Sequence, residues 1–306
     1  MVSGKWLRER LACVSSYEAP YDRRLIKLDQ EMCDFYRISA VSQHYHSISE
    51  QGNVSWTDEF PLHRAILGFA REGNQIVEFS CGTGYAADRF CARGADYIGF
   101  DLQVTRTVSA GPQHSERRRR VVDGSGYNAP IGSGVADMAV SFYALEHLVW
   151  PVKYLDEMLR VVKPGGCVAL LFPDFLAKPF KVVPSVRFGL HPGGIRAKLR
   201  RKQFLDVARS IYERLIPYRA FMVRLRRDIY QNKLRFMINT TPSCLVSEWS
   251  SDTDAVYFAS EKEVVTYLVS RGCSIKMRSR DIRRKDGTSM DCAISGNALV
   301  VAEVGG

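Results

Sequence analysis

The chain has 306 residues and a net charge of +10, from 43 Lys and Arg against 33 Asp and Glu, and its length suits one core domain with added elements. No run reaches the roughly 18 apolar residues of a membrane span, and the first residues lack an apolar signal core, so we expect a cytoplasmic protein. Its eight cysteines form no CxxC pair and no Cys/His cluster at zinc spacing, so we expect neither a metal site nor a disulfide.

The N-terminal part of the chain, residues 1–60, is expected to be mainly helical. It contains an aromatic stretch at 43–56 and precedes a first core helix predicted at 61–71. Residues 43–56 could also form a plain surface loop with a structural tryptophan.

The most informative stretch is 76–84, IVEFSCGTG, an apolar run that ends in an acid and then breaks into glycine. It predicts a strand, a tight turn and the opening of a helix, with backbone left bare for a nucleotide-like ligand. A helix is predicted at 85–93, and a second strand at 97–101 ends in Asp101. A carboxylate there, roughly 20 residues after the loop, would accept hydrogen bonds from ribose hydroxyls.

The remaining elements complete an alternating pattern of strands and helices. Further strands are expected at 119–123, 136–142, 167–173, 274–281 and 298–304. Residues 154–162 show helical spacing, and the turn at 163–166, Lys-Pro-Gly-Gly, should stop that helix. A last helix is predicted at 261–271, with Ser260 as its N-cap and Glu263 three residues later.

Taken together, these residues resemble the class I S-adenosylmethionine-dependent methyltransferases of the small-molecule type. The matching elements are EFSCGTG, Asp101, Asp123 with Gly124, ALEH at 144–147 and RVVKPGG at 160–166. The resemblance is close over 76–174 and loose over the last fifty residues. It implies a Rossmann-like, doubly wound α/β fold with a seven-stranded sheet, and S-adenosylmethionine as cofactor.

The resemblance also implies roles for individual residues. The cofactor-binding residues would be Glu78, Ser80, Gly82, Gly84, Asp101, Leu102, Asp123, Gly124 and Phe142. The loop would surround the methionine part, Asp101 would bind the ribose, and Asp123 the adenine amino group. Ser80 stands where a first glycine is usual, so we expect a slightly reshaped turn. In the family, segments placed like residues 1–60 close over the cofactor, which suggests a helical lid.

Residues on the acceptor side are predicted with less support from motifs. His147 should emerge at the carboxyl edge of the sheet, beside the sulfonium, and is the candidate base; a structural or water-ordering role is the alternative. The resemblance implies that Phe142 or Tyr143 would border the sulfonium, and Tyr143 would contact the substrate. Asp254 and Tyr257 would face the acceptor and hold sugar hydroxyls or an amine, unless 250–260 is only a well-capped loop.

The basic excess is concentrated in one segment. Residues 176–247 contain 16 Lys and Arg against three acids, an excess of 13, so the rest of the chain is slightly acidic. Helical spacing predicts two or three amphipathic helices, interrupted at Pro217. An anionic membrane surface, a phosphate-bearing small substrate and nucleic acid are possible partners, and an arginine-rich solvated face is the plain alternative. We expect nucleic acid least, because no RNA-binding module is present.

These observations lead to one functional hypothesis. The predicted parts are a helical lid at 1–60, a cofactor-binding core at 61–175, a basic helical insert after the fifth strand at 176–250, and the rest of the core sheet at 251–306. We expect a methyltransferase acting on O or N of a small polar, sugar-containing acceptor in antibiotic or envelope-glycan biosynthesis, with peripheral contact at the inner membrane face through the insert. The alternatives are C-methylation of a quinone or lipid-like acceptor, and a non-catalytic protein that docks through its insert.

Overall fold

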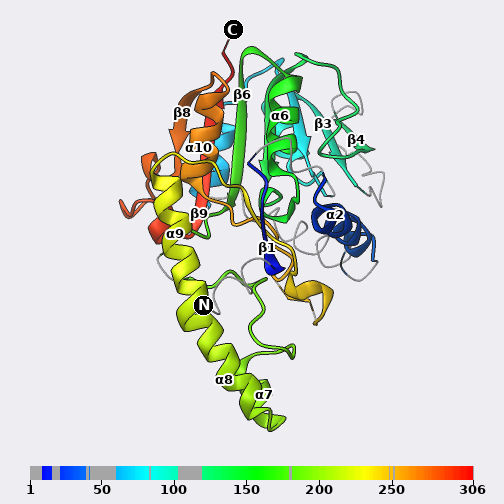
Figure 1. The fold of residues 1–306 in the computed structure, drawn as a ribbon. Helices are drawn as coiled ribbons and strands as arrows, with labels where there is room; N and C mark the ends of the chain where they lie inside the picture. The colour runs from blue at the N-terminus through cyan, green and yellow to red at the C-terminus, as the bar shows by residue number, and fades with distance from the viewer. Residues whose placement is uncertain are drawn as a thin grey trace.

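The structure is a computed structural model. It describes residues 9–15, 21–38, 41, 60–82, 84–102, 119–178, 181–247, 249–250 and 252–305, and only the backbone of 119–121 and 123. Among these residues, seven strands form the central sheet, with helices packed against it (Figure 1). None of the described helices combines the length and the apolar character needed to cross a bilayer.

The central sheet has the doubly wound arrangement that the sequence predicts. Across the sheet the strands are β4 (Arg119–Asp123), β3 (Asp96–Asp101), β2 (Gln75–Phe79), β5 (Ala136–Phe142), β6 (Val162–Pro173), β9 (Asn297–Glu303) and β8 (Ser274–Arg278). Strands β4 to β6 are parallel, and β9 runs antiparallel to both of its neighbours. The strand order reverses between β2 and β5, and in open α/β sheets ligands bind beside the carboxyl ends at such a switch point.

Helices cover both faces of this sheet because consecutive residues of its strands, which point to opposite faces, are apolar. The helices around the sheet are α2 (Arg23–Tyr36), α4 (Pro61–Leu67), α5 (Ala87–Cys91), α6 (Pro151–Val161), α10 (Glu261–Ser270) and α11 (Cys292–Ser295). Ile76 of β2 packs in one core cluster with α4 and α5, whereas the next residue, Val77, packs in another with α6 and α10. Two apolar faces on one strand are what a sheet buried on both sides requires.

The start of α10 differs from the prediction. Ser260 occupies the N-cap position as predicted, but its side chain makes no capping bond, and Asp174 Oδ2 accepts the Glu261 amide at 2.9 Å instead. Glu263 Oε1 accepts the amides of Arg235 and Phe236 at 2.5 and 3.0 Å, away from the helix start. The predicted capping box is therefore wrong, because residues distant in sequence supply the partners.

The basic segment after β6 forms a helical arm, which we define as residues 195–230. It consists of α7 (Ile195–Arg200), α8 (Phe204–Glu213), the π-helical turn η4 (Arg214–Tyr218) and α9 (Arg219–Tyr230). Figure 1 shows α8 and α9 as one long rod whose α7 end extends away from the sheet. The predicted interruption at Pro217 is wrong: the wider π turn accommodates the proline ring and its missing amide, and the rod continues.

The N-terminal segment contains an element that the sequence does not predict. Strand β1 (Leu11–Cys13) pairs antiparallel with β7 (Met237–Asn239), which follows the arm. The helix α2 agrees with the helical expectation and begins at the N-cap Asp22. The aromatic stretch 43–56 lies outside the described residues, and both the lid and the division of the chain into four parts stay predictions.

Candidate active site

A buried carboxylate lies beneath the glycine-containing loop. Glu78, near the end of β2, is 1% exposed, and the Tyr97 hydroxyl donates to its Oε2 at 2.5 Å. The next residue but one, Ser80, has φ of 55°, and Gly82 and Gly84 have φ of 55° and 68°. Three left-handed residues in five make the tight turn, and a serine in that region is strained.

Side-chain contacts hold Ser80 in this conformation. The Tyr154 hydroxyl donates to Ser80 Oγ at 3.3 Å and lies 2.8 Å from Ser141 Oγ. Beyond it, a Cβ added at Gly82 would meet no atom of the described residues within 4 Å, so these residues leave the loop backbone open. The predicted reshaping of the turn therefore occurs at Ser80, while Gly82 leaves the space that a ligand needs.

Asp101 faces this loop from the end of β3. Its Oδ2 accepts the Gly82 amide at 2.8 Å and its Oδ1 accepts the Leu102 amide at 2.7 Å. Its backbone carbonyl accepts the Gly124 amide at 2.8 Å, which ties the next loop to the same place. The side chain of Asp123 lies outside the described residues, so its contact with adenine stays a prediction.

The other side of the loop is bordered by aromatic residues at the end of β5. Phe142 is stacked on His63 of α4, with ring centroids 5.7 Å apart and planes 8° from parallel. Tyr143 has φ of 50° and is 37% exposed. Burial lowers the pKa of His63 to about 4, so this imidazole is neutral at pH 7. Nothing in the sequence around His63 indicates this position.

Sheet order explains why these groups meet. Strand β2 lies between β3 and β5, and Phe79 at its end is level with Phe100 and Ser141. Neighbouring strands are about 4.8 Å apart, so Asp101 and Phe142 flank the loop at short range. The structure thus brings the predicted loop residues, Asp101 and Phe142 to one edge.

His147 lies between two carboxylates at the same edge. It ends the 3-10 turn η3 (Leu145–His147), which follows β5. Its Nδ1 is 3.7 Å from Asp254 Oδ2 and its Nε2 is 3.5 Å from Glu146 Oε1. Burial lowers the pKa of His147, but Asp254 and Glu146 outweigh burial and hold it above its ordinary value of 6.5.

The two acids around His147 are themselves buried. Asp254 is 0% exposed, and the Tyr36 hydroxyl from α2 donates to its Oδ2 at 3.0 Å. Burial raises the pKa of Glu146 to about 7, and its Oε2 has no hydrogen-bond partner among the described residues. The sequence predicts His147 and Asp254 separately. It predicts neither their pairing nor the contact of Tyr36 with Asp254, because these residues lie far apart in the chain, Tyr36 and Asp254 by 218 positions.

Tyr257 is not brought to the acceptor side. It is 0% exposed, and its hydroxyl donates to Glu263 Oε2 at 2.8 Å within the core. Its backbone amide donates to the carbonyl of Glu146 at 2.9 Å. Tyr257 therefore supports the backbone at Glu146, and its side chain is unavailable to an acceptor.

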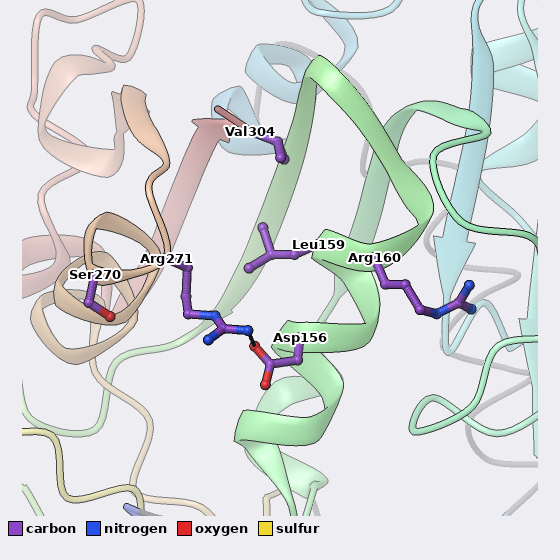
Figure 2. A pocket seen from close by; sticks show the side chains of 6 residues that line it. All are labelled: Asp156, Leu159, Arg160, Ser270, Arg271 and Val304. Atoms are coloured by element: carbon purple, nitrogen blue, oxygen red, sulfur yellow. Dashed lines mark ion pairs between the residues drawn. The ribbon is translucent and has the colours of Figure 1, made fainter. Parts of the chain in front are cut away.

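A separate cavity lies at the opposite, amino edge of the sheet. It measures about 490 Å³ and is lined by Asp156, Leu159, Arg160, Ser270, Arg271 and Val304 (Figure 2). Arg271 Nη2 and Asp156 Oδ1 form an ion pair at 3.1 Å across it. None of the predicted site residues lines this cavity.

Comparison with known proteins agrees with the geometry at the carboxyl edge. Residues 77–170 match the model of a methyltransferase domain family. An uncharacterised methyltransferase of Mycobacterium ulcerans is 33% identical over 141 residues, which are 45% of this chain and 54% of the relative. One of Mycobacterium tuberculosis is 34% identical over 130 residues, 42% of this chain and 50% of the relative. The chain thus spans about half the length of the curated relatives it matches.

Among solved structures, an S-adenosylmethionine-dependent methyltransferase from Mesorhizobium loti aligns over 81% of this chain and 98% of its own, with a TM-score of 0.48 and 16% identity. The assignment rests on the match over 77–170, the relatives and the strand order at the loop. Residues 77–170 of the chain therefore form a methyltransferase domain.

Proposed function

We propose that the chain binds S-adenosylmethionine and transfers its methyl group to an oxygen or nitrogen atom of a small polar acceptor. The observation that carries this proposal is the open loop at Gly82, held by Asp101 inside the matched domain, with His147 at the same sheet edge. The domain match supports methyl transfer as the reaction class, and the surrounding side chains support the kind of acceptor.

The groups around the loop suit this cofactor. An ionised carboxylate offers about four lone-pair sites, so Asp101 can keep its bonds to Gly82 and Leu102 and still accept from ribose hydroxyls. Gly82 and Gly84 present backbone without side chains, and Glu78 just before the loop accepts a hydrogen bond from Tyr97 of the neighbouring strand. We assign the remaining predicted contacts, Ser80, Asp123, Gly124 and Phe142, to the same site.

When bound, the cofactor supplies a methyl group activated by a sulfonium, so the protein mainly positions the acceptor and removes its proton. His147 takes that proton from the acceptor oxygen or nitrogen, and Asp254 stabilises the imidazolium that results. The hydroxyl of Tyr36 orients Asp254. Two carboxylates beside one imidazole also create a negative potential, which attracts an amine or another cationic group.

The choice of acceptor follows from this proton transfer. A hydroxyl or an ammonium has a proton that His147 can remove, and Tyr143 is exposed enough to border such a group. A sugar-containing acceptor from antibiotic or envelope-glycan biosynthesis is the chemistry we favour. Carbon methylation of a quinone and non-catalytic docking are the competing outcomes.

Calorimetric titration of the purified protein with S-adenosylmethionine and S-adenosylhomocysteine tests the first step. A labelled-methyl assay over a panel of amines, phenols, glycosides and quinones then tests the second. Micromolar binding and transfer to O or N, slowed roughly a hundredfold in His147→Gln with binding intact, is the expected result. Failure to bind either compound would overturn the proposal. Methyl transfer to carbon alone would overturn the proposed oxygen or nitrogen acceptor.

A further inference from the structure

The helical arm exposes a set of large apolar side chains. Those on α8, η4 and α9 range from 40% to 89% exposed: Phe204, Leu205, Ile211, Tyr212, Leu215, Ile216, Val223 and Tyr230. Single exposed apolar residues are ordinary on a protein surface, but a contiguous set marks a surface that another molecule covers.

These side chains share one face of the rod. At 3.6 residues per turn, the six from Phe204 to Ile216 fall within an arc of roughly 140°. The buried positions of α8, Val207, Ser210 and Glu213, fall on the opposite side and face the preceding loop, where Gly189 N donates to Glu213 Oε2. The arm therefore has two distinct faces: one packs against the protein, and the other exposes apolar side chains.

The charge on the arm is one-sided as well. Residues 195–235 contain 13 Lys and Arg but only three acids. All three acids are buried and paired: Asp206 lies 3.4 Å from Lys198, Glu213 2.9 Å from Arg209, and Asp228 2.8 Å from Arg235. Within residues 195–235, the charge presented to solvent is therefore positive.

We propose that the arm docks on an anionic phospholipid surface, with its apolar face in the boundary between headgroups and acyl chains. Helices that lie in this plane combine an apolar face with flanking cations, and the long arginine stems reach up to lipid phosphates. Arg214, Arg224 and Arg227 are exposed on the rod and are the residues we assign to those phosphates.

The same observations disfavour other occupants. Nucleic acid would meet the cations but would leave Leu205 and Ile216 against a phosphate backbone, without apolar burial. A second copy of this chain would bring two cationic arms together, and like charges repel. An anionic membrane satisfies both the charge and the apolar face.

Side-chain contacts fix α9 of the rod to the core of the protein. Phe221 of α9 packs edge-on against Phe258, with centroids 5.4 Å apart, and Arg226 donates to the carbonyl of Leu176. The chain enters the arm after β6, at the carboxyl edge of the sheet where the candidate active site lies (Figure 1). Docking would place the membrane on the acceptor side of the protein.

Co-sedimentation of the full chain with vesicles is the test. The probe is phosphatidylcholine vesicles with about 30% phosphatidylglycerol, compared with pure phosphatidylcholine. We expect binding to the anionic vesicles only, decreasing with added salt. Arg224→Gln with Arg227→Gln should weaken it about 30-fold, and Leu205→Ser with Ile216→Ser about tenfold.

Matched substitutions elsewhere are the controls. Arg71→Gln with Arg93→Gln removes the same charge from exposed positions near α4 and α5, and Val269→Ser removes an exposed apolar side chain from α10. Unchanged circular dichroism shows that each variant is folded. The proposal would be overturned if the protein did not bind anionic vesicles, or if arm and control variants weakened binding equally. It would also be overturned if the arm formed a dimer or an RNA complex in place of binding vesicles. Because vesicle binding needs neither cofactor nor acceptor, its failure is distinct from a failure of methyl transfer.

Discussion

The carboxylate of Asp101 holds the Gly82 amide and faces the place where we put the ribose. Asp101→Ala removes a charged acceptor and leaves that amide unpaired, so we expect a loss on the order of 2 kcal/mol in affinity for S-adenosylmethionine. Asp96→Ala, at the exposed start of the same strand, is the control and should bind normally. Calorimetry measures both, and unchanged affinity in Asp101→Ala would remove our placement of the cofactor.

The pairing of His147 with Asp254 predicts a pH dependence. A base acts in its neutral form, and the two carboxylates hold the pKa of His147 above 6.5, so the rate should rise with pH through a value above 6.5. Asp254→Asn removes one of these carboxylates, so the rise of kcat with pH should occur at lower pH. The maximal kcat should fall about tenfold.

The exposed substitution Asp286→Asn is the control for this experiment and should leave the kcat profile in place. A purely structural role of Asp254 would lower the amount of folded protein without changing the pH at which kcat rises. If kcat of Asp254→Asn rises at the same pH as in the unmodified protein, the proposed proton transfer is contradicted.

At the scale of elements, Phe221 is the aromatic residue among the buried side chains of α9. Phe221 is 7% exposed and contacts both Phe258 and Tyr218. Phe221→Ala leaves a cavity and should lower the free energy of unfolding by about 3 kcal/mol. Val223→Ala, at a 54% exposed position on the same helix, should change it by less than about 0.5 kcal/mol. Urea unfolding checks both, and equal effects would show that α9 is not anchored through Phe221.

The elements were predictable where their signal is local. The sequence predicts β3, β4 and β5 to within one residue, because a short apolar run between turn residues is enough to define a buried strand. It fails at Pro217, where a π turn continues the rod, and at Ser260, where Asp174 takes the capping role. At Pro217 the wider π turn removes the clash that ends an ordinary helix. At Ser260 the side chain of Asp174, distant in sequence, accepts the amide that a neighbouring residue was expected to bind.

At the scale of the whole molecule, cofactor binding should raise thermal stability. A ligand that binds the folded state alone at 100 times its Kd adds about 2.7 kcal/mol, which corresponds to roughly 5 °C in Tm for a chain of this size. Scanning calorimetry with S-adenosylmethionine measures this shift. The arm variant Arg224→Gln with Arg227→Gln should show the same increase in Tm. A smaller increase would indicate that the arm and the cofactor site are energetically coupled.

The sequence by itself determined the α/β core, the glycine-containing loop with its acid at the next strand end, and the concentration of basic residues in one segment. Each of these depends on residues close together in the chain, where sterics and side-chain period act directly. Only the tertiary structure decided that Tyr36, His147 and Asp254 meet, that Tyr257 turns into the core, and that the three acids of the arm face inward. Those outcomes depend on how distant segments pack, because burial and charge pairing are properties of the folded chain and have no local signal.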